Sequence, residues 1–225
     1  MTGTGTGAEQ RRTRLVVVDD DALVRAGLRL MLDGARGIEV VGEAADGAGV
    51  VAVLDAHPTD VVLMDLRMPG VDGVEGTRRV CARSDPPAVV VLTTFDTDDE
   101  VVAALRAGAS GYLLKDMAPD RIVAAVLAAA AGEPVLSPGI ARRLMASAAA
   151  SGGARARALG ALGRLTVRER EVAVGIGRGA SNAQIAARLH VSVPTVKAHV
   201  TNVLLKLGLT NRTQVALLVA EAGED

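Results

Sequence analysis

Aromatic side chains are almost absent from this 225-residue chain, which has one phenylalanine, Phe95, one tyrosine, Tyr112, and no tryptophan. Proteins that hold single-stranded nucleic acid commonly stack its bases on aromatic rings. The composition therefore argues against a base-stacking platform, and equally against a pocket that sandwiches a cofactor between rings.

Cysteine and long apolar runs are scarce too. Cys81 is the only cysteine, which excludes an internal disulfide, and no other Cys or His stands near it at the spacing of metal ligands. The longest stretch of Ala, Val, Leu and Ile covers residues 122–131, far short of the roughly 20 residues that a membrane-spanning helix needs. The first fourteen residues lack the apolar segment of a secretory signal. We expect a cytoplasmic protein.

The net charge of −1 conceals an asymmetry between the two halves of the chain. Residues 1–132 carry 13 Lys and Arg against 20 Asp and Glu, whereas residues 133–225 carry 12 against 6. An acidic half suits cations, and a basic half suits phosphate backbones or acidic surfaces. The halves are expected to meet different partners.

The hydrophobic pattern predicts two domains of different class. Between residues 14 and 132, short apolar runs alternate with amphipathic stretches, which is typical of βα units around a five-stranded parallel sheet. The five expected strands are 15–18, 38–41, 61–64, 88–93 and 111–114. Residues 133–160 are rich in Ala, Gly, Ser and Arg and are expected to form a linker with room for one helix. Residues 161–221 show four helix-sized segments, with capping boxes starting at Thr166 and Ser181, and predict a small all-α domain.

Polar residues follow four of the predicted strands. Asp19, Asp20 and Asp21 come after the first strand, and Asp65 after the third; Thr93 and Lys115 come at the ends of the fourth and fifth. The carboxyl ends of parallel strands meet at one edge of such a sheet, where ligands bind. Close carboxylates repel one another unless a hard dication neutralises them, so the pattern predicts a Mg²⁺ or Mn²⁺ site. Asp21 is also placed to cap the helix that follows.

The same edge holds the groups that phosphoryl transfer requires. Asp65 is placed to attack a phosphoryl group and become an aspartyl phosphate. A metal, Lys115 and Thr93 would then stabilise the phosphoryl oxygens. Any one of these residues alone is better explained as a turn former, a cap or a solvated lysine. Their joint occurrence at four strand ends favours the site.

Four segments carry a family resemblance over residues 14–132: VVVDDDALVR, DVVLMDLRMPGVDG, VVVLTTFD and GYLLKD. They resemble the receiver domain of two-component response regulators, which has a flavodoxin-like fold. The resemblance implies that Asp19 and Asp20 bind the divalent metal with Asp65 and the backbone oxygen of Met68. It further implies that Asp65 accepts the phosphate and that Thr93, Lys115 and the aromatic residue Tyr112 respond to it.

In the basic half, residues 181–208 predict a helix-turn-helix, with a tight turn at His190 and Val191. Apolar residues at helical spacing define the core side of its second helix, and small or polar residues define the other side. That exposed side is where a recognition helix meets base edges in the major groove. The predicted base-reading residues are Lys197, Ala198, Thr201 and Asn202, and the predicted phosphate contacts are Arg188, Lys206 and Arg212.

Residues 165–220, which include LTVREREV and SNAQIAARLHVSVPTVKAHV, closely resemble a LuxR-type DNA-binding domain. The whole chain resembles a response regulator of the NarL/FixJ class. The resemblance implies a cognate sensor histidine kinase as phosphate donor, double-stranded DNA as target, and a homodimer on activation through the last helix. It also implies that Glu169 helps to hold the scaffold.

We therefore expect a transcription regulator switched by phosphorylation of Asp65, and not an enzyme beyond slow self-catalysed phosphoryl transfer and hydrolysis. Two alternatives remain open at the level of sequence. One is a regulator that binds DNA without needing phosphate. The other is a phosphorelay or phosphatase component whose basic half binds an acidic protein.

Overall fold

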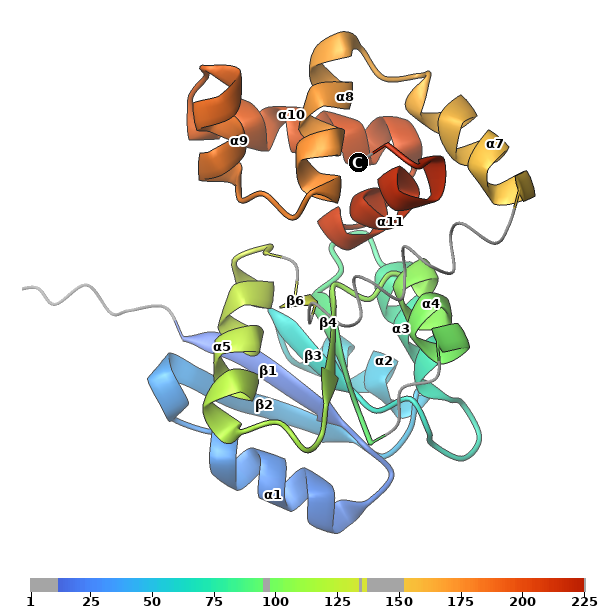
Figure 1. Cartoon of the computed structure of the whole chain (residues 1–225). Helices are drawn as coiled ribbons and strands as arrows, with labels where there is room; N and C mark the ends of the chain where they lie inside the picture. Colours follow the sequence, from blue (N-terminus) through green and yellow to red (C-terminus); the bar gives the residue numbers. More distant parts are fainter. Residues whose placement is uncertain (1–11, 95–97, 134, 137–151, 225) are drawn as a thin grey trace, which may run out of the picture.

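The computed structural model describes residues 12–94, 98–133, 135–136 and 152–224. These residues form two lobes, one above the other in Figure 1. The lower lobe is built on a parallel β-sheet, and the upper lobe consists of helices. The predicted division into an α/β domain and an all-α domain is confirmed.

In the lower lobe, strands and helices alternate along the chain. Its elements are β1 (Thr13–Val18), α1 (Ala22–Leu32), a 3-10 turn (Ala35–Gly37), β2 (Ile38–Ala44), α2 (Gly49–Ala56), β3 (Val61–Met64), α3 (Gly73–Cys81), β4 (Ala88–Thr93), α4 (Asp98–Ala107), β5 (Gly111–Leu114), α5 (Pro119–Ala130) and β6 (Val135–Leu136). The strand order is β2-β1-β3-β4-β5-β6, and every adjacent pair is parallel. All five expected strands are present.

The sixth strand was not predicted. It is only two residues long and pairs Val135 with Gly111 and Leu136 with Tyr112 at the edge of the sheet. So short a segment carries no alternation that a sequence pattern could reveal. Its close fit depends on Gly111, where a Cβ atom would lie 2.6 Å from the Cβ of Val135.

The sheet is covered on both faces, which is why its strands are nearly continuous apolar runs. Successive side chains of a strand point to opposite faces. Leu15 and Val17 of β1 therefore pack with α1 and α5, whereas Val16 and Val18 pack with α2 and α3. A third cluster joins α4 to Val91 and Tyr112. The buried sheet fixes the positions of the loops at its carboxyl edge.

Within residues 152–224, which the structure describes, the upper lobe has five helices: α7 (Gly152–Leu162), α8 (Val167–Gly177), α9 (Asn182–Leu189), α10 (Val193–Leu207) and α11 (Arg212–Ala222). The last four are the helices expected in residues 161–221. The first helix, α7, begins inside the span 133–160, which was expected to be a linker with room for one helix, and residues 137–151 of that span lie outside the described residues. Ala158 and Leu162 of α7 are buried in the core of the upper lobe. Its Ala, Gly and Arg composition gave a weak helical signal, but the packing of these two residues makes α7 part of the domain.

The predicted helix starts are confirmed by their hydrogen bonds. Thr166 and Glu169 form a reciprocal capping box at α8, and Ser181 and Gln184 form another at α9. Ser192 caps α10, which ends at Gly208 in the left-handed conformation. Ser192 therefore fixes the start of α10 directly after the turn at which α9 ends.

The two lobes meet where α11 lies on α4 and on the turn that leads into β5 (Figure 1). Within the described part of the chain, no single helix has the length and apolarity to cross a bilayer. Among the described residues, α10 and α11 have the required length and apolarity only when counted as one segment, and they are bent by 68° relative to each other.

Candidate functional site

Three carboxylates meet at the carboxyl edge of the sheet. Val18 and Met64 are neighbours in the pairing of β1 with β3, so the residues that follow them, Asp19 and Asp65, emerge side by side. One oxygen each from Asp19, Asp20 and Asp65 lies within 4.8 Å of the others. Asp19 and Asp65 are buried, and Asp20 is exposed at the rim. The predicted convergence is therefore observed.

Lys115, which follows β5, reaches two of these carboxylates. Its Nζ lies 2.5 Å from Oδ2 of Asp19 and 3.1 Å from Oδ2 of Asp65. Burial raises the pKa of Asp65, and the hydrogen bond from Lys115 only partly opposes this effect. Burial lowers the pKa of Lys115, but its bonds to Asp19 and Asp65 together outweigh burial and raise it. The lysine therefore stays charged and partly neutralises the acids.

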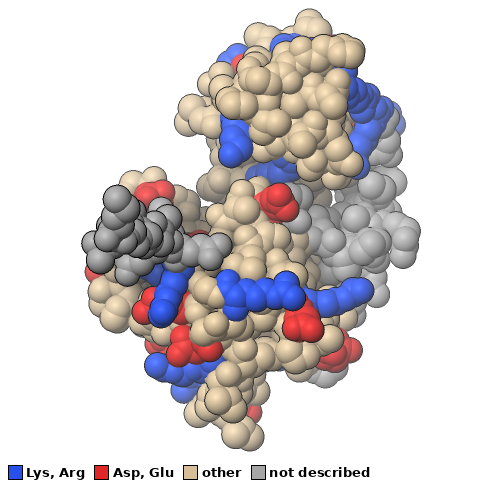
Figure 2. All heavy atoms as spheres, turned by 90° about the vertical axis from the view of Figure 1, so that its left-hand side faces the viewer, with Lys and Arg blue, Asp and Glu red and all other residues tan. Residues whose placement is uncertain are grey.

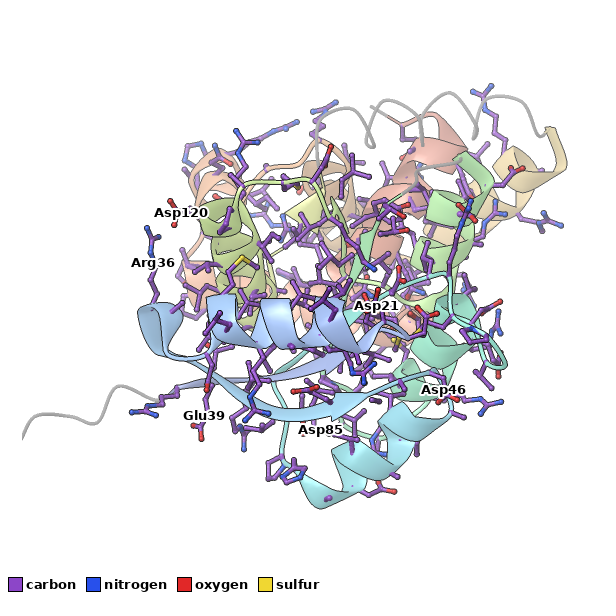
Figure 3. The ribbon with its side chains drawn as sticks, turned by 90° about the horizontal axis from the view of Figure 1, so that it is seen from below. Asp21, Arg36, Glu39, Asp46, Asp85 and Asp120 are labelled. Atoms are coloured by element: carbon purple, nitrogen blue, oxygen red, sulfur yellow. The ribbon has the colours of Figure 1, made fainter. Side chains whose placement is uncertain are left out.

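Backbone groups fix the directions of the acids. Oδ1 of Asp19 accepts a hydrogen bond from the backbone N–H of Asp21, and Oδ1 of Asp65 accepts one from Leu66, at 3.0 and 2.8 Å. The side chain of Asp21 accepts from the N–H groups of Leu23 and Val24, so Asp21 is the cap of α1. Figure 3 shows Asp21 at the end of α1, which crosses the lobe in the view from below.

The residues at this edge fit a hard divalent cation. Oδ2 of Asp19 is buried, and its described partner is the ammonium of Lys115 at 2.5 Å; no backbone N–H of the described residues donates to it. Carboxylate oxygens are the ligands that Mg²⁺ and Mn²⁺ prefer. Met68, whose backbone oxygen is the predicted further ligand, is buried in the loop after Asp65. Its role as a ligand stays a prediction.

Thr93 and Tyr112 occupy neighbouring strands beyond Asp65. Thr93 is the buried last residue of β4, and its carbonyl oxygen accepts a hydrogen bond from the N–H of Lys115 at 2.8 Å. Tyr112 lies on β5, fully buried in the cluster beneath α4. The structure thus places Thr93 at the end of the strand next to β3, and the aromatic ring on the strand beyond it. Their response to phosphate stays a prediction.

Sequence reasoning missed Gly73, the first residue of α3. A Cβ atom on Gly73 would lie 1.9 Å from the backbone oxygen of Asp65 and 2.7 Å from Cα of Leu66. The N–H of Gly73 also donates to the carbonyl of Leu66. The loop that presents Asp65 can close on the helix only if residue 73 is glycine. The signal in the sequence was the last glycine of the MPGVDG segment, which follows Asp65 in the same loop.

In the upper lobe, α9 and α10 form the predicted helix-turn-helix. His190, in the left-handed conformation, ends α9 and turns the chain toward α10. Val196 and Val203 of α10 are buried in the domain core, whereas the predicted base-reading residues are exposed: Lys197, Ala198, Thr201 and Asn202. Arg188, on α9, is exposed as well.

Two of the predicted phosphate contacts are engaged within the protein. Arg212 is 8% exposed, and its guanidinium donates to the carbonyl oxygen of Ala180 and to Oδ1 of Asn182. In this conformation Arg212 ties the start of α11 to the loop before α9, and its role as a phosphate contact stays a prediction. Lys206 donates to Glu169 at 2.7 Å, which gives its ammonium a partner inside the domain. These three bonds join segments that are distant in sequence, so no local sequence pattern predicts them.

The charge asymmetry of the sequence corresponds to the division into lobes. On the face shown in Figure 2, most of the acidic side chains lie on the lower lobe, among basic ones, whereas the few charged side chains seen on the upper lobe are mainly Lys and Arg. The acidic cluster and the helix-turn-helix therefore lie in lobes of opposite net charge.

Comparison with known proteins assigns each half of the chain to a domain family. Residues 15–127 match the family model described as the response regulator receiver domain, and residues 164–219 match the one described as bacterial regulatory proteins of the luxR family. The transcriptional regulatory protein LiaR of Bacillus subtilis is 40% identical over 207 residues, covering 91% of this chain and 95% of LiaR. The nitrate/nitrite response regulator NarL of Escherichia coli K12 is 36% identical over 212 residues, covering 94% and 97%.

Solved structures give the same result. The crystal structure of the response regulator ChrA, from a heme-sensing two-component system, is 37% identical with a TM-score of 0.52, covering 95% of this chain and 99% of ChrA. The receiver domain of the putative response regulator NarL from Mycobacterium tuberculosis is 41% identical, also with a TM-score of 0.52, over 55% of this chain and 99% of that domain. Fold, acidic site and sequence agree, and the chain belongs to the response regulators that join a receiver domain to a LuxR-type DNA-binding domain, which are transcriptional regulators of two-component systems.

Proposed function

We propose that Asp65 accepts a phosphoryl group from a cognate histidine kinase and that this event controls DNA binding by the upper lobe. The observation that carries the proposal is the convergence of Asp19, Asp20, Asp65 and Lys115 at one edge of the sheet. A buried carboxylate beside one lysine and two further acids has the components for receiving a phosphoryl group and for holding a divalent cation.

The chemistry assigned to each side chain follows from its position. An Asp65 oxygen attacks phosphorus, the bond from phosphorus to the donor breaks, and the donor leaves with its electron pair. Burial raises the pKa of Asp65, which makes its carboxylate more basic than an exposed one. Lys115 already touches Asp65 and is placed to bind a phosphoryl oxygen. A bound Mg²⁺ would be held by Asp19, Asp20, Asp65 and the backbone oxygen of Met68, and it would offset the charge on the phosphoryl oxygens.

Transmission to the upper lobe would begin at Thr93 and Tyr112. The added phosphate carries about −1.5 to −2 charges, if it ionises as other phosphomonoesters do. Thr93, on the strand beside Asp65, would turn its hydroxyl toward this charge. The buried ring of Tyr112 would then repack. The two states must differ in affinity for the phosphate by roughly 10⁴-fold if the chain is to change from mostly inactive to mostly active.

The surface proposed to contact duplex DNA consists of Lys197, Ala198, Thr201 and Asn202 on α10, with Arg188 on α9. In this conformation one edge of α10 faces the receiver. Lys197 lines a pocket together with Glu133, and Val200 and Leu204 line another with Pro87 and Gly108. This arrangement supports restraint of the DNA-binding lobe by the unmodified receiver. A homodimer of the released form would read two half-sites about one helical turn apart.

Phosphorylation can be tested with acetyl phosphate and Mg²⁺. The native chain should gain the mass of one phosphoryl group, and Asp65→Asn should not. Asp85→Asn, which changes an exposed aspartate outside the acidic cluster, is the matched control and should behave as native. An unchanged mass of the native chain would remove the proposed function.

DNA binding can be tested by mobility shift of a duplex fragment at several salt concentrations, before and after phosphorylation. Affinity should fall with a slope of about −0.9 in log[salt] for each phosphate contacted. Equal affinity with and without phosphate would favour the regulator that acts independently of phosphorylation. Insensitivity to salt would favour a protein partner for the basic lobe.

A further inference from the structure

We propose that Arg25 of α1, held in place by Glu43 of β2, is a positioning residue for the divalent cation: it fixes the backbone from which the carboxylates of Asp19 and Asp20 extend toward Asp65. The inference deepens the proposed function and rests on it, because the acidic edge of the sheet must hold the cation. Arg25 acts through the loop that carries two of the three acids, and not on the phosphoryl group.

The first observation is a set of hydrogen bonds from one residue to three successive carbonyl groups. Nη1 of Arg25 donates to the backbone oxygen of Asp19 at 2.7 Å and to that of Asp20 at 3.3 Å. The backbone N–H of Arg25 donates to the carbonyl oxygen of Asp21 at 3.0 Å. Residues 19–21 are the whole connection between β1 and α1. Arg25 therefore holds every residue of the loop that presents Asp19 and Asp20.

Asp20 depends on these bonds more than the other two acids do. The carboxylates of Asp19 and Asp65 each accept a hydrogen bond from a backbone N–H, and both contact Lys115. Among the residues that the structure describes, none donates a hydrogen bond to the carboxylate of Asp20 or forms an ion pair with it. The bond from Arg25 to the backbone oxygen of Asp20 therefore restrains the point from which this exposed side chain extends.

The guanidinium of Arg25 is itself held from the neighbouring strand. Its Nε lies 3.5 Å from Oε2 of Glu43, and the Arg25 side chain is 18% exposed. Arg29, one turn further along α1, pairs with Oε1 of Glu43 at 3.1 Å and is 53% exposed. Within the described part of the chain, the guanidinium of Arg29 contacts Glu43 but not the loop 19–21. Arg29 therefore shares the carboxylate partner of Arg25 and lacks its bonds to the loop, which makes it a matched control.

Position and charge predict opposite effects of removing Arg25. A guanidinium is always charged, and its charge repels a cation bound nearby. If Arg25 acted by charge alone, Mg²⁺ would bind more tightly without it. If Arg25 holds the loop, its loss frees Asp19 and Asp20, and the cation must then order them at a cost in conformational entropy. Loss of a residue that orients the ligands of a metal typically weakens metal binding by about 10- to 100-fold.

The central experiment measures the affinity of the full-length, unphosphorylated chain for Mg²⁺ alone, from its melting temperature at a series of MgCl₂ concentrations. Arg25→Gln should raise the Kd for Mg²⁺ by about 10- to 100-fold. Arg25→Lys keeps the charge but loses the forked geometry of the guanidinium, so it should give an intermediate Kd. Arg29→Gln removes an equal charge from the same helix and should bind as the native chain does. Native or tighter binding of Mg²⁺ by Arg25→Gln would overturn the proposal.

A double-variant cycle tests the part played by Glu43. Glu43→Ala should weaken Mg²⁺ binding less than Arg25→Gln does, because the bonds from Arg25 to the loop can persist without it. In the chain that carries both changes, the Kd should equal that of Arg25→Gln alone, since Glu43 then has no Arg25 to hold. If the two factors multiply instead, Glu43 acts on the cation by its own negative charge, which contradicts its role as the support of Arg25.

Phosphorylation by acetyl phosphate separates this inference from the proposed function. In Arg25→Gln, the Mg²⁺ concentration that gives half of the maximal rate should rise by the same factor as the Kd. The maximal rate should change far less, because the contact of Lys115 with Asp65 does not involve Arg25. If the native chain binds Mg²⁺ but is not phosphorylated, the proposed function fails. If the native chain is phosphorylated and Arg25→Gln needs no more Mg²⁺ than it does, the positioning role of Arg25 fails and the proposed function stands.

Discussion

Gly73 and Asp65 approach so closely that a Cβ atom on Gly73 would lie 1.9 Å from the backbone oxygen of Asp65. We therefore expect Gly73→Ala to displace the loop that presents the phosphoacceptor. The clash is with backbone, which cannot turn aside as a flexible side chain does. The variant should lose about 1–3 kcal/mol of stability, as overpacked sites do, and should be phosphorylated more slowly.

Thermal unfolding and phosphorylation by acetyl phosphate measure the two effects of Gly73→Ala. The control is Gly27→Ala in the middle of α1, where an added Cβ meets nothing within 4 Å. Replacing a helical glycine at an open position stabilises a protein by about 0.5–1 kcal/mol, so the control should gain stability. If Gly73→Ala has native thermal stability and a native rate of phosphorylation, the loop accommodates the added Cβ atom without displacing Asp65.

The receiver site could be predicted from sequence because its parts follow from topology. Apolar runs identified the strands, and parallel strands bring their carboxyl ends to one edge. Asp19, Asp65 and Lys115 could therefore be placed together without knowledge of any contact. The same reasoning could not separate the two roles of Asp21, since a residue after a strand is equally able to line the site and to cap the next helix. The side chain of Asp21 accepts hydrogen bonds from the backbone N–H groups of Leu23 and Val24, which shows that it caps α1.

What the sequence could not predict depends on contacts between distant segments. Lys197 and Arg212 are both basic residues in the first part of a helix, yet one is exposed and the other is buried against the loop before α9. The strand β6 exists because Gly111 admits Val135, a match that neither segment reveals alone. The apolar residues of α11 do not gather on one face, because Val215 and Val219 pack in its own domain and Leu217 packs with the receiver, so its docking leaves no amphipathic pattern in the sequence.

Binding of Mg²⁺ should stabilise the native chain. A ligand that binds only the folded state adds RT ln(1 + [L]/Kd), about 2.7 kcal/mol at one hundred times Kd. Asp19 supplies one of the three carboxylates that converge at this edge, so Asp19→Asn should remove most of this increment. Asp85→Asn, outside the acidic cluster, should retain it.

The melting temperature as a function of Mg²⁺ concentration tests this expectation. EDTA should return the native chain to its metal-free value. If the native chain and Asp19→Asn respond equally to Mg²⁺, the cation binds somewhere other than the edge of the sheet.

Glu169 should make the DNA-binding domain sensitive to acid. The hydrogen bond from Lys206, with those from Thr166, lowers the pKa of Glu169 to about 2, from a usual value of 4.5. A carboxyl group whose pKa is lowered by folding stabilises the protein above its unfolded pKa. This contribution should be complete above about pH 5 and should disappear as pH falls from there through the folded pKa near 2.

The comparison of the native chain with Glu169→Gln isolates that contribution. The glutamine keeps an acceptor for Thr166 but has no charge to pair with Lys206, so it should be less stable at neutral pH and lose less on acidification. Helix content measured by circular dichroism during thermal unfolding, between pH 7 and pH 2.5, follows both proteins. Parallel pH profiles of the two melting temperatures would show that Glu169 does not carry the effect.

Lys197 and Arg212 should give opposite results when each is replaced. Lys197 is exposed on α10, so Lys197→Ala should weaken duplex binding, reduce the salt slope by about 0.9 and leave the melting temperature unchanged. Arg212 donates to Ala180 and Asn182 from a buried position. Arg212→Met should lower stability by about 1.5–3 kcal/mol, the usual contribution of a hydrogen bond to a charged group, and leave the salt slope unchanged below the melting temperature.

The two measurements together decide which residue contacts DNA, because a phosphate contact changes the salt slope and a structural contact changes the melting temperature. Arg212→Lys refines the result. A lysine retains the charge but cannot donate in the forked geometry of a guanidinium, so it should destabilise the domain almost as much as methionine does. A reduced salt slope with native stability in Arg212→Met would return Arg212 to the DNA surface and would require α11 to rearrange on binding.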